Sequence, residues 1–63
     1  MLDRPTLFFV ADHLLARAQA ERIMRDNARR KGQSDIAQMH ADRAQAFTEA
    51  AIAVPKLFNN VEA

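Results

Sequence analysis

Helix-breaking residues are scarce in this chain, and their positions divide it into two long segments. The 63 residues include one glycine, Gly32, and two prolines, Pro5 and Pro55. Between Thr6 and Lys31 nothing interrupts a helix, and alanine, leucine, arginine, glutamine, glutamate and methionine predominate. All six are good helix formers. A chain punctuated in this way is predicted to fold as two helices joined at Gly32.

Local signals at the ends of the segments predict the helix boundaries. Asp3 is suited to cap the first helix, and Pro5 falls in its first turn, where a missing N–H costs little. Ser34 is suited to cap the second helix. Pro55 removes a hydrogen bond and clashes with the preceding turn, so it ends or kinks that helix. We therefore predict one domain, 1–63, with helices over about 4–31 and 34–54, a turn at 32–33 and a short helical tail at 56–60.

The connection between the helices fixes the fold class. A two-residue connection makes two helices antiparallel neighbours, and no segment shows the β-branched alternation typical of strands. The predicted fold is an all-α, two-helix antiparallel hairpin. A chain this short usually needs a staple or a partner, and the absence of cysteine excludes a disulfide. The hairpin is therefore expected to form a homodimer that is a four-helix bundle.

The first segment carries two apolar stripes at helical spacing. One stripe is assigned to the contact between the two helices, and it consists of Phe9, Ala16, Ala20, Ile23 and Met24. It is expected to meet an apolar stripe of the second helix, which consists of Ile36, Phe47, Ala50, Ala51, Val54, Leu57 and Phe58. The other stripe is predicted to stay uncovered and to form a dimer or partner interface, and it consists of Leu7, Phe8, Ala11, Leu14, Leu15 and Ala18.

Basic residues cluster toward the end of the first helix. They are Arg22, Arg25, Arg29, Arg30 and Lys31, with Arg43 of the second helix expected nearby. One interpretation is a surface that contacts nucleic-acid phosphates, and the other is a solvated helix end whose charges complement the helix dipole. The net charge of only +1 and the interleaved acidic residues favour the second interpretation.

Residues suited to catalysis or metal binding are few. Neither His13 nor His40 has a further ligand three or four residues away, so no metal site is predicted. His40 is expected to face Asn27 across the hairpin in a polar layer that fixes the register. Ser34 and Thr48 have no evident activating base, and two helices offer no concave pocket. We therefore predict a protein that is not an enzyme and has no cofactor.

Composition and hydropathy indicate where such a chain works. The apolar run after Thr6 is broken by Asp12 and His13, which excludes a spanning helix of about 20 apolar residues. Basic residues do not flank that run, so a membrane-surface role is not expected either. Absence of cysteine fits a reducing compartment. A cytoplasmic protein is expected.

In architecture alone, the predicted dimer resembles the small plasmid copy-number regulators that bind paired RNA loops. No sequence motif is shared with them, so no residue role carries over. The general type also resembles small bacterial or phage regulators that occupy the surface of a larger protein. The expected function is a small non-catalytic regulator or inhibitor that binds a protein partner through the apolar face, with the arginines as a rim. The alternative is a dimeric nucleic-acid-binding regulator that uses the basic end of the first helix.

Overall fold

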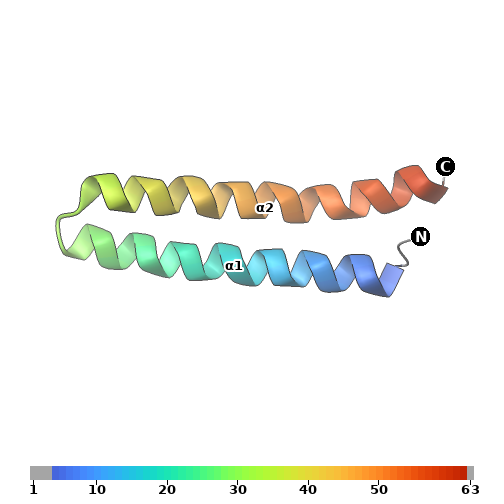
Figure 1. Ribbon diagram of the computed structural model, residues 1–63, viewed down its shortest axis with the longest axis horizontal. Helices are drawn as coiled ribbons and strands as arrows, with labels where there is room; N and C mark the ends of the chain where they lie inside the picture. The colour runs from blue at the N-terminus through green and yellow to red at the C-terminus, as the bar shows by residue number, and fades with distance from the viewer. Residues whose placement is uncertain (1–3, 63) are drawn as a thin grey trace.

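The computed structural model is a hairpin of two long helices, and it describes the backbone of residues 4–62 and the side chains of residues 4–56. Helix α1 spans Arg4–Arg30 and helix α2 spans Ser34–Glu62. The helices lie side by side and antiparallel, so that the start of α1 lies beside the last turns of α2 (Figure 1). No strand occurs within residues 4–62. The predicted all-α hairpin is confirmed, whereas the capping role of Asp3 lies outside the described residues.

The end of α1 is closed by backbone hydrogen bonds around a left-handed glycine. The Gly32 N–H donates to the Arg29 carbonyl at 3.0 Å, and the Gln33 N–H donates to the Ala28 carbonyl at 2.9 Å. This pair of bonds is the Schellman motif, which satisfies carbonyls that the helix leaves without partners. Gly32 has a φ of 74°, in the region that side chains with a Cβ disfavour. The turn predicted from Gly32 is therefore confirmed.

We expect Gly32→Ala to lower the free energy of unfolding by about 1–2 kcal/mol, the cost of a left-handed conformation for a residue with a Cβ. An added Cβ would meet nothing within 4 Å, so backbone strain is the only penalty. Urea unfolding of the variant measures this cost, with Gln33→Ala as the control because Gln33 bonds through its backbone. Equal stability of Gly32→Ala and the unmodified chain would contradict the role of Gly32.

Helix α2 differs from the prediction at both of its ends. The Gln33 carbonyl accepts the first bond of the helix, from the Ala37 N–H at 2.9 Å, so Gln33 occupies the capping position expected for Ser34. At the other end the helix continues through Pro55 to Glu62. A proline removes one helical hydrogen bond, and here the ordered turns on both sides carry the helix past it. The predicted end at residue 54 is wrong, and the residues of the predicted tail belong to α2.

The contact surface of α1 is the stripe that the sequence had placed outside the hairpin. Its buried residues are Leu7, Ala18, Glu21 and Ala28, and Ala11, Leu14 and Arg25 are half-buried between them. These positions alternate in steps of four and three, the 3.5-residue period of helices that wind around each other. We call this set the seam of α1.

The stripe that the sequence had assigned to the seam instead faces away from α2. Phe9 is 74% exposed and Ile23 is 56% exposed, and Ala16 between them is exposed as well. We call Phe9, Ala16 and Ile23 the outer stripe of α1. The predicted packing of Phe9 on Leu57 and Phe58 concerns side chains outside the described set, but the exposure of Phe9 already shows that the assignment to the seam is wrong.

Small residues explain why the seam lies where it does. On α2 the buried positions are Ala37, Ala44, Ala51 and Val54, and no large side chain of the described part is fully buried. Alanines let two helices approach closely, which Phe9 or Ile23 in the contact would prevent. The predicted contact positions Ala51 and Val54 are confirmed as buried and Phe47 is half-buried, whereas Ile36 and Ala50 are exposed.

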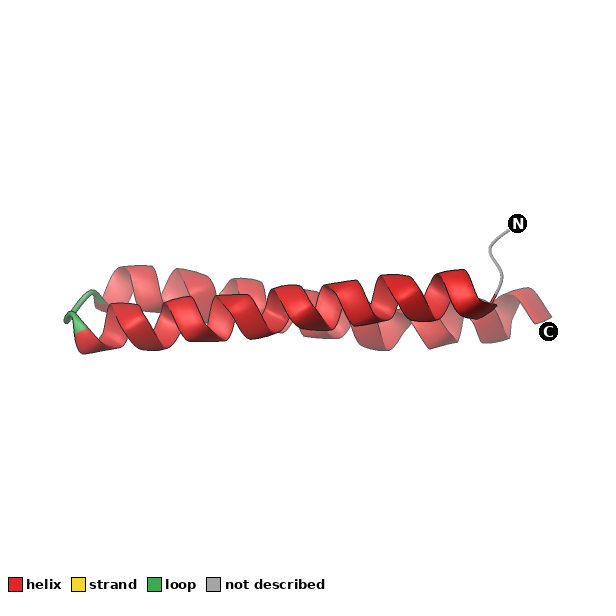
Figure 2. Cartoon of the chain, turned by 90° about the horizontal axis from the view of Figure 1, so that it is seen from below, coloured by secondary structure: helices red, strands yellow, loops and turns green. Residues whose placement is uncertain are grey.

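The hairpin is long and thin. The helices cross at a shallow angle (Figure 2), and the principal extents are 48 × 16 × 12 Å. The radius of gyration is 14.6 Å, whereas a compact domain of this length has about 11 Å. The accessible surface is 4769 Å², which is large for such a small chain. Much apolar surface therefore remains in contact with solvent.

Neither helix, over the residues that are described, combines the length and the apolar character required to cross a membrane.

Candidate interaction surface

The residues predicted to form an interface are divided by the fold into two groups. Leu7 and Ala18 are 5% and 0% exposed within the hairpin, so their placement on an uncovered surface is wrong. Ala11 and Leu14 are half-buried in the same seam. Phe8 and Leu15 remain exposed. The reason is the seven-residue repeat of the seam. It turns Leu7, Ala11, Leu14 and Ala18 toward α2, whereas Phe8 and Leu15 each lie one residue further round the helix and stay exposed.

The free column forms a straight row along one edge of the seam. Phe8, Leu15, Arg22 and Arg29 are spaced by seven residues, so they lie almost in line along α1. We call these four residues the interaction row. It is apolar at the open end of the hairpin and basic toward the turn. Of the predicted interface residues, this row keeps Phe8 and Leu15 exposed, with Arg22 and Arg29 in line with them.

Helix α2 borders the interaction row with a polar contact and an exposed isoleucine. Arg22 Nη2 donates to Thr48 Oγ1 at 2.9 Å, and Thr48 Oγ1 donates to the Ala44 carbonyl at 2.9 Å. This bond shows which edge of α2 lies next to the row. Ile52 is four residues beyond Thr48, one helical turn toward the open end, and is 57% exposed. Phe8, Leu15 and Ile52 thus flank the seam on the same side.

A shallow groove continues the row toward the turn. It crosses from α1 to α2 beside the bond between Arg22 and Thr48, and it is lined by Arg22, Arg25, Ala41, Ala44, Gln45, Thr48 and Glu49. Guanidinium, hydroxyl, amide and carboxylate groups all line it. The groove therefore offers polar groups of both charge signs next to the interaction row.

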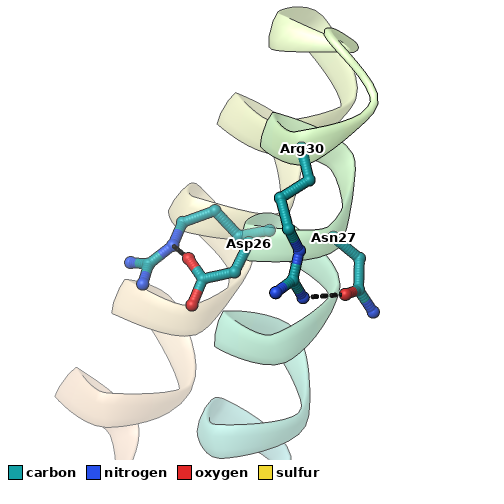
Figure 3. A network of polar contacts seen from close by, with 4 residues as sticks. Asp26, Asn27 and Arg30 are labelled. Atoms are coloured by element: carbon teal, nitrogen blue, oxygen red, sulfur yellow. Dashed lines mark hydrogen bonds and ion pairs between the residues drawn. The ribbon is translucent and has the colours of Figure 1, made fainter.

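The remaining basic residues are held in local contacts or lie at the turn. Arg25 Nε donates to Asp26 Oδ1 at 3.0 Å, and an Arg30 guanidinium N–H donates to the Asn27 side chain (Figure 3). Both contacts are within α1. Arg29 and Lys31 are exposed. Within the predicted basic cluster, Arg22 and Arg25 therefore share the groove, whereas Arg30 is held by a contact along α1.

A buried carboxylate in the seam is the feature that the sequence interpretation missed. Glu21 is 4% exposed, and its carboxylate contacts the His40 ring Nδ1 and, at 3.2 Å, Arg43 Nε. From the sequence, His40 is expected to face Asn27 and Arg43 to lie near the basic cluster, and neither expectation includes Glu21. Glu21 lies fourteen residues after Leu7 and three after Ala18, so the seven-residue repeat of the seam places it in the contact. The spacing of the sequence therefore indicates that Glu21 is buried.

The polar groups considered for chemistry are engaged in contacts within the hairpin. Thr48, considered as a nucleophile, is occupied between Arg22 and the Ala44 carbonyl. Within residues 4–56, no three side chains of the histidine, aspartate or glutamate type are grouped so as to hold a metal ion. All the buried side-chain polar atoms of this part have hydrogen-bond partners. The polar contacts across the seam therefore serve to align the helices.

Comparison with known proteins adds no relative, since no family model, no curated protein and no solved structure matches this chain.

Proposed function

We propose that this chain is a small non-catalytic regulator or inhibitor that binds a protein partner through the interaction row. The observation that carries the proposal is the exposure of Phe8 and Leu15, at 51% and 46%, beside a seam filled with alanine. Large apolar side chains that are left outside while small ones are buried are typical of an interface. The arginines of the row act as a charged rim that orients an approaching partner.

A nucleic-acid partner has less support. Arg22 is bonded to Thr48 in the hairpin, and Arg25 and Arg30 have partners within α1. No aromatic side chain lies among them to stack on bases. Each of these guanidinium groups keeps further N–H donors, but its position is already set by a contact within the hairpin. The apolar side chains of Phe8 and Leu15 suit a protein surface rather than phosphates.

The proposal includes self-association of the hairpin into a four-helix assembly and a cytoplasmic setting. Self-association is supported by the size of the seam, because alanines bury little area and the chain has no disulfide to compensate. Absence of cysteine also suits a reducing compartment.

The double variant Phe8→Ser/Leu15→Ser tests the role of the row. We expect the unmodified tagged chain to capture a protein from its host that the variant does not capture, with nuclease leaving the capture unchanged. The purified partner should then bind the purified chain directly, and the variant should bind at least tenfold more weakly. Both replaced side chains are exposed, so circular dichroism should show an intact helical hairpin.

The matched control is Ile36→Ser/Met39→Ser, which replaces exposed residues on the edge of the seam opposite the interaction row. It should leave binding of the partner unchanged. Equal binding by the row variant would contradict the proposed surface. Loss of all capture on nuclease treatment would instead indicate the nucleic-acid alternative. In that case binding should also fall steeply with salt.

A further inference from the structure

The outer stripe of α1 is an apolar surface that the hairpin leaves uncovered. Phe9, Ala16 and Ile23 lie in line on the helix side opposite the seam, and Val10 and Met24 beside them are also exposed. We propose that a second copy of this chain covers the stripe, α1 against α1, with the two-fold axis close to Ala16. The inference rests on the self-association proposed above and is independent of the interaction row.

The solvent-accessible surface of one chain is larger than that of a compact chain of the same mass. A compact folded chain of 7.1 kDa exposes about 4,100 Å², whereas the hairpin exposes 4769 Å². The excess is close to the roughly 800 Å² that each partner contributes to a standard stable interface. One additional contact along α1 would therefore bring the chain to the surface expected for its mass.

Three charged residues in the middle of α1 contact α2 rather than the outer stripe. The Arg17 guanidinium lies 5.5 Å from the ring centroid of Phe47 on α2, so its charge is directed toward the seam. Glu21 is buried against His40 and Arg43, and Arg22 bonds to Thr48. These three charged residues of the middle of α1 all turn toward α2. The exposed charges that remain beside the outer stripe are those of Asp12 and Asp26, which would lie at the polar rim of the contact.

The outer side of α2 is acidic, whereas the outer stripe of α1 is apolar. Asp35, Asp42 and Glu49 are exposed and spaced by seven residues, so they form an acidic line. Two such lines would repel each other if α2 met α2 in a symmetric dimer. Contact through the outer stripe of α1 avoids this repulsion.

The sequence of the outer stripe is self-complementary when the helices are antiparallel. With the axis at Ala16, Phe9 of one copy meets Ile23 of the other at both ends, and the two Ala16 residues meet in the middle. A parallel arrangement would instead bring the exposed basic ends at Arg29, Arg30 and Lys31 side by side, where like charges repel. The antiparallel arrangement places these basic ends at opposite ends of the assembly.

Cysteine cross-linking tests the arrangement directly, since the chain has no cysteine of its own. Under mild oxidation we expect Ala16→Cys to form a disulfide-linked dimer at least tenfold faster than the control Glu49→Cys, whose side chain is also exposed. A mixture of Phe9→Cys and Ile23→Cys chains should form the mixed dimer faster than either chain alone. Equal rates for Ala16→Cys and Glu49→Cys would overturn the proposal.

Sedimentation equilibrium supplies a second test that does not depend on oxidation. We expect the unmodified chain to be a dimer at micromolar concentration and Ile23→Glu to be monomeric with its helicity retained, because Ile23 has no part in the seam. A monomeric unmodified chain would overturn the proposal. So would a dimer that persists in Ile23→Glu but is lost in Phe8→Ser/Leu15→Ser. Failure of the interaction row in partner binding leaves both expected results unchanged.

Discussion

Ala18→Leu should lower the free energy of unfolding by about 1–3 kcal/mol, because extra methyl groups in a filled core force the backbone apart. Ala18 is 0% exposed, and the buried positions on α2 are mostly alanines, whose close approach leaves no space for a larger side chain. A chain of 63 residues is expected to have roughly 3–9 kcal/mol of total stability. A change of this size removes a large part of it.

Urea unfolding followed by far-UV circular dichroism measures the effect. The matched control is Ala46→Leu, which places the same side chain at an exposed position of α2. The control should stay within about 0.5 kcal/mol of the unmodified chain. If Ala18→Leu were as stable as Ala46→Leu, the seam would not run through Ala18 and the packing described above would be wrong.

Glu21→Ala should lower the free energy of unfolding by about 1–3 kcal/mol, the cost of leaving buried hydrogen-bonding groups without a partner. The carboxylate is the shared partner of His40 and Arg43 from α2. Because Glu21 is 4% exposed, water does not readily replace it. The residual cluster would combine a half-buried imidazole and an arginine with no acidic group between them.

Glu49→Ala is the control for this experiment. Glu49 is exposed and accepts a hydrogen bond from Gln45 within α2 at 3.0 Å, a local contact of small value. Its loss should change stability by no more than about 0.5 kcal/mol. Equal effects of the two glutamate variants, measured by urea unfolding, would show that the buried cluster has no special role in aligning the helices.

The elements of this fold are predictable from the sequence, because local chemistry determines them. Gly32 supplies the only glycine between two runs of helix formers, and the structure places the turn there. Pro55 is the exception. A proline lowers helix stability by a fixed local cost, and the sequence alone does not show whether the neighbouring turns compensate for it. In the structure α2 continues past Pro55 to Glu62.

The size of the apolar side chains does not predict which of the two stripes of α1 packs against α2. Helix α1 carries two stripes at helical spacing, and the sequence interpretation gave the seam to the stripe with Phe9 and Ile23. Close antiparallel packing favours small residues instead, so Ala18 and Ala28 occupy the contact. The seven-residue spacing of Ala37, Ala44 and Ala51 on α2 is the pattern that identifies this choice. Buried Glu21 was missed for the same reason, since its role follows from the seam.

The same choice determines the candidate surfaces. Once Leu7 and Ala18 are buried, Phe8 and Leu15 remain for a partner, and Phe9 and Ile23 remain for a second copy. Of the residues predicted to form an interface, Phe8 and Leu15 are therefore exposed, whereas Leu7 and Ala18 are buried inside the hairpin.

Thermal unfolding at increasing chain concentration tests most directly whether a second copy completes this hairpin. Association of folded chains makes the midpoint of unfolding depend on concentration. We predict that the Tm of the unmodified chain rises with concentration, and that the Tm of Ile23→Glu does not. A fully helical chain whose Tm is the same at every concentration would contradict self-association through the outer stripe.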